Sequence, residues 1–182
     1  IIVAIDSNEF IKATSILESL DPNLCLVKIG SVSFSSMGKI FLRLASQKGF
    51  RIFLDLKFHD IPNTVYESIT SFNDCAIDML TVHLSGGEQM LVQAKKAAKE
   101  INSKVIGVSM LTSLNKDDSV TLFDSSIDNQ IKRLFLLAKK INLDGVVCSP
   151  HELEMASHIL GSNFLKITPG IREKKVNDDQ VR

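Results

Sequence analysis

Short apolar segments recur along the chain and alternate with segments of helical spacing. Residues rich in Ile, Val and Leu form near-continuous apolar runs, which we predict to be strands, at 1–5, 24–30, 51–57, 79–84, 104–111, 144–149 and 164–168. Apolar residues at helical spacing predict helices over 10–20, 38–48, 62–72, 87–101, 127–141 and 150–160. Residues 113–126 follow neither pattern, and we expect an extended loop there.

This alternation predicts the fold class. Near-continuous apolar strands separated by helices indicate an α/β protein in which helices cover a parallel sheet. Regular spacing over seven units favours a TIM (β/α)8 barrel over an open doubly wound sheet, and no Gly-rich phosphate loop follows the first strand. We therefore expect residues 1–182 to form a single (β/α) barrel domain.

The pattern supplies one βα unit fewer than such a barrel needs. Without an eighth strand, the first and seventh strands would keep unpaired edges. We therefore expect the domain to be incomplete at its C-terminus and the natural protein to continue past Arg182 by about 25 to 45 residues. The chain also begins on Ile1, inside an apolar segment, as expected of a piece of a longer protein.

Composition and charge narrow the classes of function. Lys plus Arg and Asp plus Glu both number 21, so the chain lacks the net positive charge that attracts nucleic acid or anionic membranes. No apolar run approaches the roughly 18 residues that span a bilayer. Cys25, Cys75 and Cys148 are widely spaced in apolar surroundings, which favours neither disulfides nor a zinc site. We expect a cytoplasmic protein that binds no nucleic acid and no membrane.

Charged side chains lie where the first three predicted strands end. Asp6, Lys28, Asp55 and Lys57 occupy these positions, and the carboxyl ends of barrel strands are where TIM-barrel chemistry takes place. Because the three strands are neighbours, a closed network of two positive and two negative charges can form. The later strand ends carry single polar residues, for which strand termination is the simpler explanation.

The segment 53–64, FLDLKFHDIPNT, places charges inside a strand. Asp55 and Lys57 are two residues apart and should point to one face, while Leu54 and Leu56 face the helices. A protein with a buried ion pair is often no more stable than one with apolar residues at the same positions. The stability of the fold alone therefore does not explain these charges. A lysine held between carboxylates can deliver a proton into a water-poor site. The alternative is a stabilising ion-pair ladder.

Two further side chains in this region have ordinary structural explanations. Pro62 suits the first turn of a helix, so capping that helix is the better interpretation of Asp60 from spacing alone. His59 and His83 lie in separate βα units without a third ligand at a suitable spacing, so we predict no metal site.

DLKFHDIPNT is similar to the D-x-K-x-x-D-I-P-N-T segment of the orotidine 5'-phosphate decarboxylase family, in its bacterial form. The resemblance runs through essentially the whole chain, in residues 4–6, 27–30, 81–83, 86–87, 111–113, 145–149, 168–172 and 179–182. A bare D-x-K-x-x-D is moderately specific, but these flanking pieces in order make the resemblance much stronger.

The resemblance implies a TIM-barrel homodimer whose active sites are shared across the interface. It further implies decarboxylation of orotidine 5'-phosphate to UMP in de novo pyrimidine biosynthesis, without metal or organic cofactor. Lys57 is then the proton donor to C6 of the pyrimidine after CO2 leaves, and Asp55 lies beside the departing carboxylate. Lys28 and Asp60 of the second subunit complete the charge array.

Substrate contacts are also implied by the resemblance. Asp6 and Lys28 hold ribose hydroxyls, and Thr64 reaches the ribose across the dimer. The other implied contacts are Asp55, Lys57, Asp60 and Ile61 from the same segment, Thr112 at the pyrimidine edge, and Arg172 and Gln180 on the phosphate side. The arginine with which the family's eighth strand grips the phosphate would lie beyond residue 182.

Two alternatives to this function stay open. Sugar-phosphate decarboxylases and aldolases of the same superfamily share the D-x-K-x-x-D core but use Mg²⁺ to stabilise an enediolate. The segments 61–64, 111–113 and 168–172 favour the nucleotide enzyme over them. The other alternative is a noncatalytic phosphate-binding barrel, against which the presence of all four charges argues.

Overall fold

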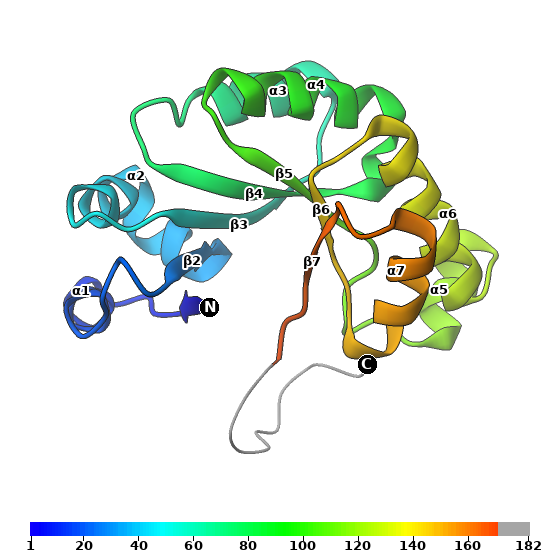
Figure 1. The fold of residues 1–182 in the computed structure, drawn as a ribbon, viewed down its shortest axis with the longest axis horizontal. Helices are drawn as coiled ribbons and strands as arrows, with labels where there is room; N and C mark the ends of the chain where they lie inside the picture. The colour runs from blue at the N-terminus through cyan, green and yellow to red at the C-terminus, as the bar shows by residue number, and fades with distance from the viewer. Residues whose placement is uncertain (171–182) are drawn as a thin grey trace.

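Residues 1–170, which the computed structural model describes, form one curled sheet with helices on its outer side (Figure 1). All strands are parallel and follow chain order: β1 (Ile2–Ile5), β2 (Leu26–Gly30), β3 (Ile52–Phe58), β4 (Ile77–His83), β5 (Lys104–Val108), β6 (Gly145–Val147) and β7 (Leu165–Ile167). Each strand pairs with the next, as in a (β/α) barrel. The predicted fold class is confirmed, and β1 and β7 are the two edges of the sheet within this part of the chain.

Helices connect the strands and cover the convex face of the sheet (Figure 1). They are α1 (Phe10–Glu18), α2 (Ser31–Gln47), α3 (Pro62–Thr70), α4 (Gly87–Glu100), α5 (Lys116–Phe123), α6 (Ile127–Ile141) and α7 (Leu153–Leu160), with short 3-10 turns at Leu84–Gly86 and Pro150–Glu152. Within the described residues, none of these helices combines the length and hydropathy needed to cross a membrane.

Two predicted boundaries are wrong. The expected loop over 113–126 contains α5, because Asn115 builds a capping box: its side chain accepts the amide of Asp118 at 3.0 Å, and the Asp118 carboxylate accepts the Asn115 amide at 2.9 Å. These bonds satisfy amides that a helix start otherwise leaves without partners. Helix α2 begins well before the expected residue 38, and Gly38, at φ 58°, interrupts it with a kink.

The sheet carries apolar side chains on both faces. Leu54 and the other side chains on its outer face are packed against the helices. The concave face carries a separate cluster with one side chain from each of the strands β1 to β7: Ile2, Leu26, Phe53, Met79, Ile106, Val147 and Ile167. This layer corresponds to the side-chain layers that fill a barrel interior. Two residues further along their strands, on the same face, come Lys28, Asp55 and Thr81.

Candidate active site

The carboxyl ends of β1, β2 and β3 bring four charged side chains together. Lys28 Nζ lies 3.4 Å from Asp6 Oδ1 and 3.8 Å from Asp55 Oδ2. Lys57 Nζ lies 2.9 Å from Asp55 Oδ1. The four residues thus form a continuous chain of alternating sign, Asp6–Lys28–Asp55–Lys57. Asp6 is its most exposed side chain, at 61%, and Asp55 its least exposed, at 15%.

Asp55 is the centre of this arrangement. One of its carboxylate oxygens lies near Lys28, and the other accepts hydrogen bonds from Lys57 Nζ and from the hydroxyl of Thr81, both at 2.9 Å. A carboxylate this far removed from water is stable only when such partners replace its hydration. The two lysines and Thr81 therefore replace the hydration of the Asp55 carboxylate at the wall of the site, and Asp55 in turn fixes the position of the Lys57 ammonium.

The backbone at Lys57 departs from strand geometry. Its φ of 51° lies in the left-handed region, which costs an L-residue about 1 to 2 kcal/mol. The pairing of β3 with β4 passes from Leu54↔Leu80 directly to Phe58↔Val82. Three residues of β3 therefore face the single residue Thr81, and the strand bulges. Asp55 and Lys57 do lie side by side, as the sequence predicts. Regular strand alternation is not the whole cause, because the bulge and the left-handed backbone at Lys57 also set their positions.

Thr81 spans this bulge. Its hydroxyl accepts the backbone N–H of Lys57 at 2.8 Å and donates to Asp55 Oδ1 at 2.9 Å, and its side chain is fully buried. From the sequence alone, Thr81 stands out only as part of the matching segment 81–83, with no role of its own. The available signal was a hydroxyl at an inward-facing position of an otherwise apolar strand, where a buried polar group must find partners.

Ser33, at the start of α2, supports the position of Asp6. Its buried Oγ lies 2.5 Å from the carbonyl oxygen of Ile5 and accepts the amide of Ser7 at 3.2 Å. These two contacts hold the backbone immediately before and after Asp6. This second supporting hydroxyl was also missed from the sequence, because it depends on α2 starting at Ser31.

Gly30 keeps the space around Lys28 open. A Cβ at this position would lie 3.4 Å from Lys28 Nζ and 3.8 Å from Asp6 Oδ1. Because Gly30 follows Lys28 by two residues on the same face of β2, any larger side chain would point at the lysine ammonium.

The start of α3 carries three of the expected site residues at the surface. Asp60 and Thr64 are exposed, and Ile61 is 67% exposed. Asp60 accepts the amide of Ile61 at 2.7 Å, and within residues 1–170 it forms no ion pair with Lys28 or Lys57. The capping interpretation of Asp60 is wrong, because Ile61 is the N-cap residue and has no side-chain cap; Pro62 does occupy the first turn.

The remaining expected substrate contacts come from later in the chain. Thr112 is half-buried in the segment between β5 and α5. Arg172 and Gln180 lie outside the described residues.

His59 and His83 form a pair beside the charged residues. Their ring centroids are 5.2 Å apart. Burial lowers the pKa of His83 below its ordinary value, and its neighbours His59 and Lys57 lower this pKa further, against a smaller opposing effect of Asp55. The surroundings of His83 therefore favour its uncharged imidazole form. No group of three or more His, Cys, Asp or Glu side chains within residues 1–170 is arranged to hold a metal ion.

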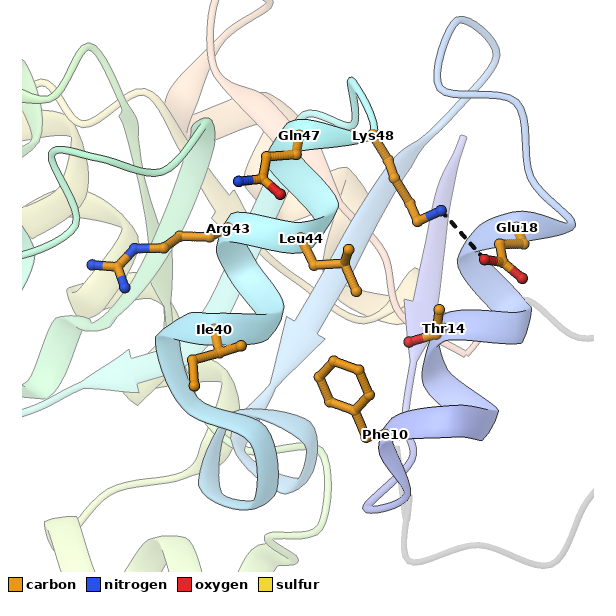
Figure 2. Close-up of a pocket in the computed structure, with 8 residues that line it drawn as sticks. All are labelled: Phe10, Thr14, Glu18, Ile40, Arg43, Leu44, Gln47 and Lys48. Atoms are coloured by element: carbon orange, nitrogen blue, oxygen red, sulfur yellow. Dashed lines mark hydrogen bonds and ion pairs between the residues drawn. The ribbon is translucent and has the colours of Figure 1, made fainter.

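A groove of about 480 Å³ lies elsewhere, on the outer layer between α1 and α2 (Figure 2). Phe10, Ile40 and Leu44 line it, and the Lys48–Glu18 ion pair, at 3.4 Å, spans one end. Its charged groups do not converge on a ligand position, since Lys48 and Glu18 neutralise each other and the Arg43 guanidinium points away from the groove and pairs with Asp74 at 2.6 Å (Figure 2). We therefore place the candidate active site at the strand ends.

The fold and the charged residues together define a (β/α)-barrel protein with its site at the carboxyl ends of the strands. The family model for the orotidine 5'-phosphate decarboxylase / HUMPS family matches residues 1–182. The chain belongs to this family.

Individual relatives agree with this assignment. The chain is 39% identical to orotidine 5'-phosphate decarboxylase of Saccharophagus degradans, with all of this chain and 78% of the relative covered. It is 42% identical to the protein of the same name from Wigglesworthia glossinidia brevipalpis, with 100% and 80% covered. The crystal structure of orotidine 5'-phosphate decarboxylase from Lactobacillus acidophilus superposes with a TM-score of 0.87 at 36% identity, over 94% of this chain and 81% of that one.

Proposed function

We propose that this protein decarboxylates orotidine 5'-phosphate to UMP, a step of pyrimidine biosynthesis, without metal or organic cofactor. Membership of the family and the names of its relatives support the substrate. The observation that carries the proposal is the chain Asp6–Lys28–Asp55–Lys57, in which an ammonium is held 2.9 Å from a carboxylate at the mouth of the barrel.

The reaction requires this kind of site. The bond from C6 to the carboxylate breaks, its electron pair stays on C6, and CO2 leaves. The resulting carbanion has no conjugated electron sink, so fixed charges must stabilise it. The ammonium of Lys57 does this and then transfers its proton to form the C6–H bond, after which the amine regains a proton from solvent.

Asp55 has two functions in this proposal. It anchors Lys57, and its negative charge repels the substrate carboxylate, which favours the departure of CO2. We assign the larger effect to preorganisation, because Asp55 is already fixed by Lys28, Lys57 and Thr81 without substrate. Lys28, together with Asp6, binds the ribose hydroxyls in addition to balancing the charge of Asp55.

Further contacts come from a second subunit in a homodimer with shared sites. Asp60, Ile61 and Thr64 are exposed at the start of α3, directly after the strand that carries Lys57, so they are available to a neighbouring site. Asp60 completes the charge array of the partner, and Thr64 binds its ribose. Thr112 contacts the pyrimidine edge, while Arg172 and Gln180 serve the phosphate.

The test is the loss of ultraviolet absorbance of orotidine 5'-phosphate on incubation with the purified full-length protein, with and without EDTA. Turnover that EDTA leaves unchanged supports the proposal, and Lys57→Ala is the matched inactive control. Turnover only of sugar phosphates, abolished by EDTA and restored by Mg²⁺, would instead identify the Mg²⁺-dependent reaction of the superfamily. Binding of UMP without any turnover would identify a noncatalytic barrel.

A further inference from the structure

Thr81 occupies a position that neither the family match nor the motif explains. The bulge at residues 55–57 removes the regular ladder bonds between β3 and β4, and Thr81 is the one residue of β4 between the paired positions Leu80 and Val82. Its hydroxyl supplies the missing bonds, one to the backbone of Lys57 and one to the side chain of Asp55.

These contacts close a ring. The Thr81 hydroxyl bonds Asp55 Oδ1, the same oxygen accepts the Lys57 ammonium at 2.9 Å, and the Lys57 amide returns to the Thr81 hydroxyl. Both ends of Lys57, its backbone and its ammonium, are therefore fixed through one oxygen of Asp55 and one hydroxyl. Because the side chain of Thr81 is fully buried, water cannot replace its hydroxyl without rearrangement.

The left-handed conformation of Lys57 makes this ring necessary. A lysine relaxes from φ 51° toward the strand region unless its surroundings hold it. Relaxation would rotate the Cα–Cβ bond of Lys57 and carry the ammonium away from Asp55. The hydrogen bond from the Lys57 amide to the Thr81 hydroxyl opposes this rotation directly.

We infer that Thr81 is a positioning residue for Lys57: its hydroxyl maintains the left-handed backbone of the lysine and orients the carboxylate of Asp55, so that the ammonium is aimed at the reacting carbon. Thr81 acts through these two residues and does not touch the substrate. The inference rests on the proposed function for its kinetic consequences, whereas its structural part concerns the conformation of Lys57 in the protein without substrate.

The experiment compares Thr81→Val, which keeps the shape and removes the hydroxyl, with Thr81→Ser, which keeps the hydroxyl. Thr14→Val is the matched control, since the hydroxyl of Thr14 is buried without a hydrogen-bond partner within the described residues. We expect Thr81→Val to lower kcat by about 10- to 100-fold, the loss that follows a misplacement of about 1 Å, with KM changed much less. Thr81→Ser should recover most of the lost kcat, and Thr14→Val should leave kcat unchanged.

A second measurement does not depend on activity. Hydrogen exchange of the Lys57 amide in the full-length wild-type protein should be slow, and it should accelerate by about tenfold or more in Thr81→Val, because the amide loses its acceptor. Fast exchange in the wild-type protein would overturn the inference even if Thr81→Val did not fold.

The kinetic outcomes are equally decisive. A Thr81→Val kcat within twofold of wild type overturns the inference, and so does a Thr81→Ser variant as impaired as Thr81→Val, which would show that shape alone matters. If the wild-type protein does not decarboxylate orotidine 5'-phosphate, the proposed function fails, and the exchange of the Lys57 amide still decides whether Thr81 positions the lysine.

Discussion

The ammonium of Lys57 lies 2.9 Å from the carboxylate of Asp55, although the backbone of Lys57 is in the left-handed region. The shortest ion pair of the candidate site is thus made by the residue with the most strained backbone in its strand. Strain at a half-buried, charged position is a feature of functional sites, where the surrounding structure holds a backbone conformation that an L-residue otherwise rarely adopts.

Replacing Lys57 with alanine should remove turnover while leaving the fold intact. The change deletes the proton donor and one member of the charge network, whereas the apolar layers on both faces of the sheet are untouched. We expect kcat to fall by at least about 10²- to 10⁴-fold, the contribution typical of a positioned acid. Steady-state kinetics and far-ultraviolet circular dichroism together check this, and unchanged turnover would refute the role of Lys57.

Replacing Lys57 with glycine should give a more stable protein than replacing it with alanine. Glycine relieves a left-handed conformation that costs about 1 to 2 kcal/mol, which exceeds the roughly 0.4 to 1 kcal/mol of additional unfolded-state entropy that glycine brings. The free energy of unfolding from urea denaturation should therefore be about 0.5 to 1 kcal/mol higher for Lys57→Gly. An alanine variant as stable as the glycine variant would show that residue 57 is not strained.

Mixed dimers test whether the site is shared. Dimers of only Lys57→Ala or only Asp60→Ala subunits should be nearly inactive. An equal mixture of the two subunits should recover up to about a quarter of the activity of the same amount of wild-type protein. Random mixing makes half of the dimers heterodimers, and one of the two sites in each contains both intact residues. The measurement is decarboxylation after co-refolding of two differently tagged subunits. Heterodimers isolated by both tags that remain inactive would contradict a shared site.

Stability should decrease as the pH falls below about 6.5, in part because of His83. Burial holds the pKa of this imidazole below its ordinary value of 6.5 in the folded protein. The unfolded chain therefore binds a proton first as the pH falls, and folding loses stability between pH 6.5 and the lowered pKa. Urea midpoints measured from pH 7.5 to 5 should show a smaller decline for His83→Gln than for wild type, and equal declines would contradict the assignment.

Gly30 should tolerate one methyl group but not a branched side chain. A Cβ there would be in ordinary contact with Lys28 Nζ, at 3.4 Å, so Gly30→Ala should retain most of the activity. The γ carbons of Gly30→Val would occupy the place of the ammonium and separate Lys28 from Asp6 and Asp55. We expect kcat/KM to fall by about tenfold or more, equal to roughly 1.4 kcal/mol of transition-state stabilisation. Equal values for the two variants would contradict this account.

Much of the fold was predictable because the apolar runs are continuous and the spacing between them is regular. Parallel pairing of β1, β2 and β3 then places their carboxyl ends together, so Asp6, Lys28 and Asp55 could be expected to meet from topology alone. Helix α5 was missed because its formation depends on the capping box at Asn115, and its apolar periodicity is weak.

The supporting part of the site was not predictable in the same way. The role of Thr81 exists only because β3 bulges opposite it, and that bulge is a property of the packed sheet that no periodicity in residues 51–57 reveals. The contact of Ser33 with the backbone around Asp6 likewise requires the packing of α2 against β1. Charged groups at strand ends can be read from a sequence, whereas the uncharged hydroxyls that orient them become apparent only in three dimensions.

The left-handed backbone at Lys57 also decides which comparison isolates the cost of its strain. Alanine keeps the strained conformation and glycine releases it, while both remove the ammonium, so only the difference between these two variants measures the strain itself. Either change leaves Asp55 with Lys28 as its one cationic partner within the described residues. Engineering for heat resistance should therefore leave residue 57 unchanged and seek its gains at other positions.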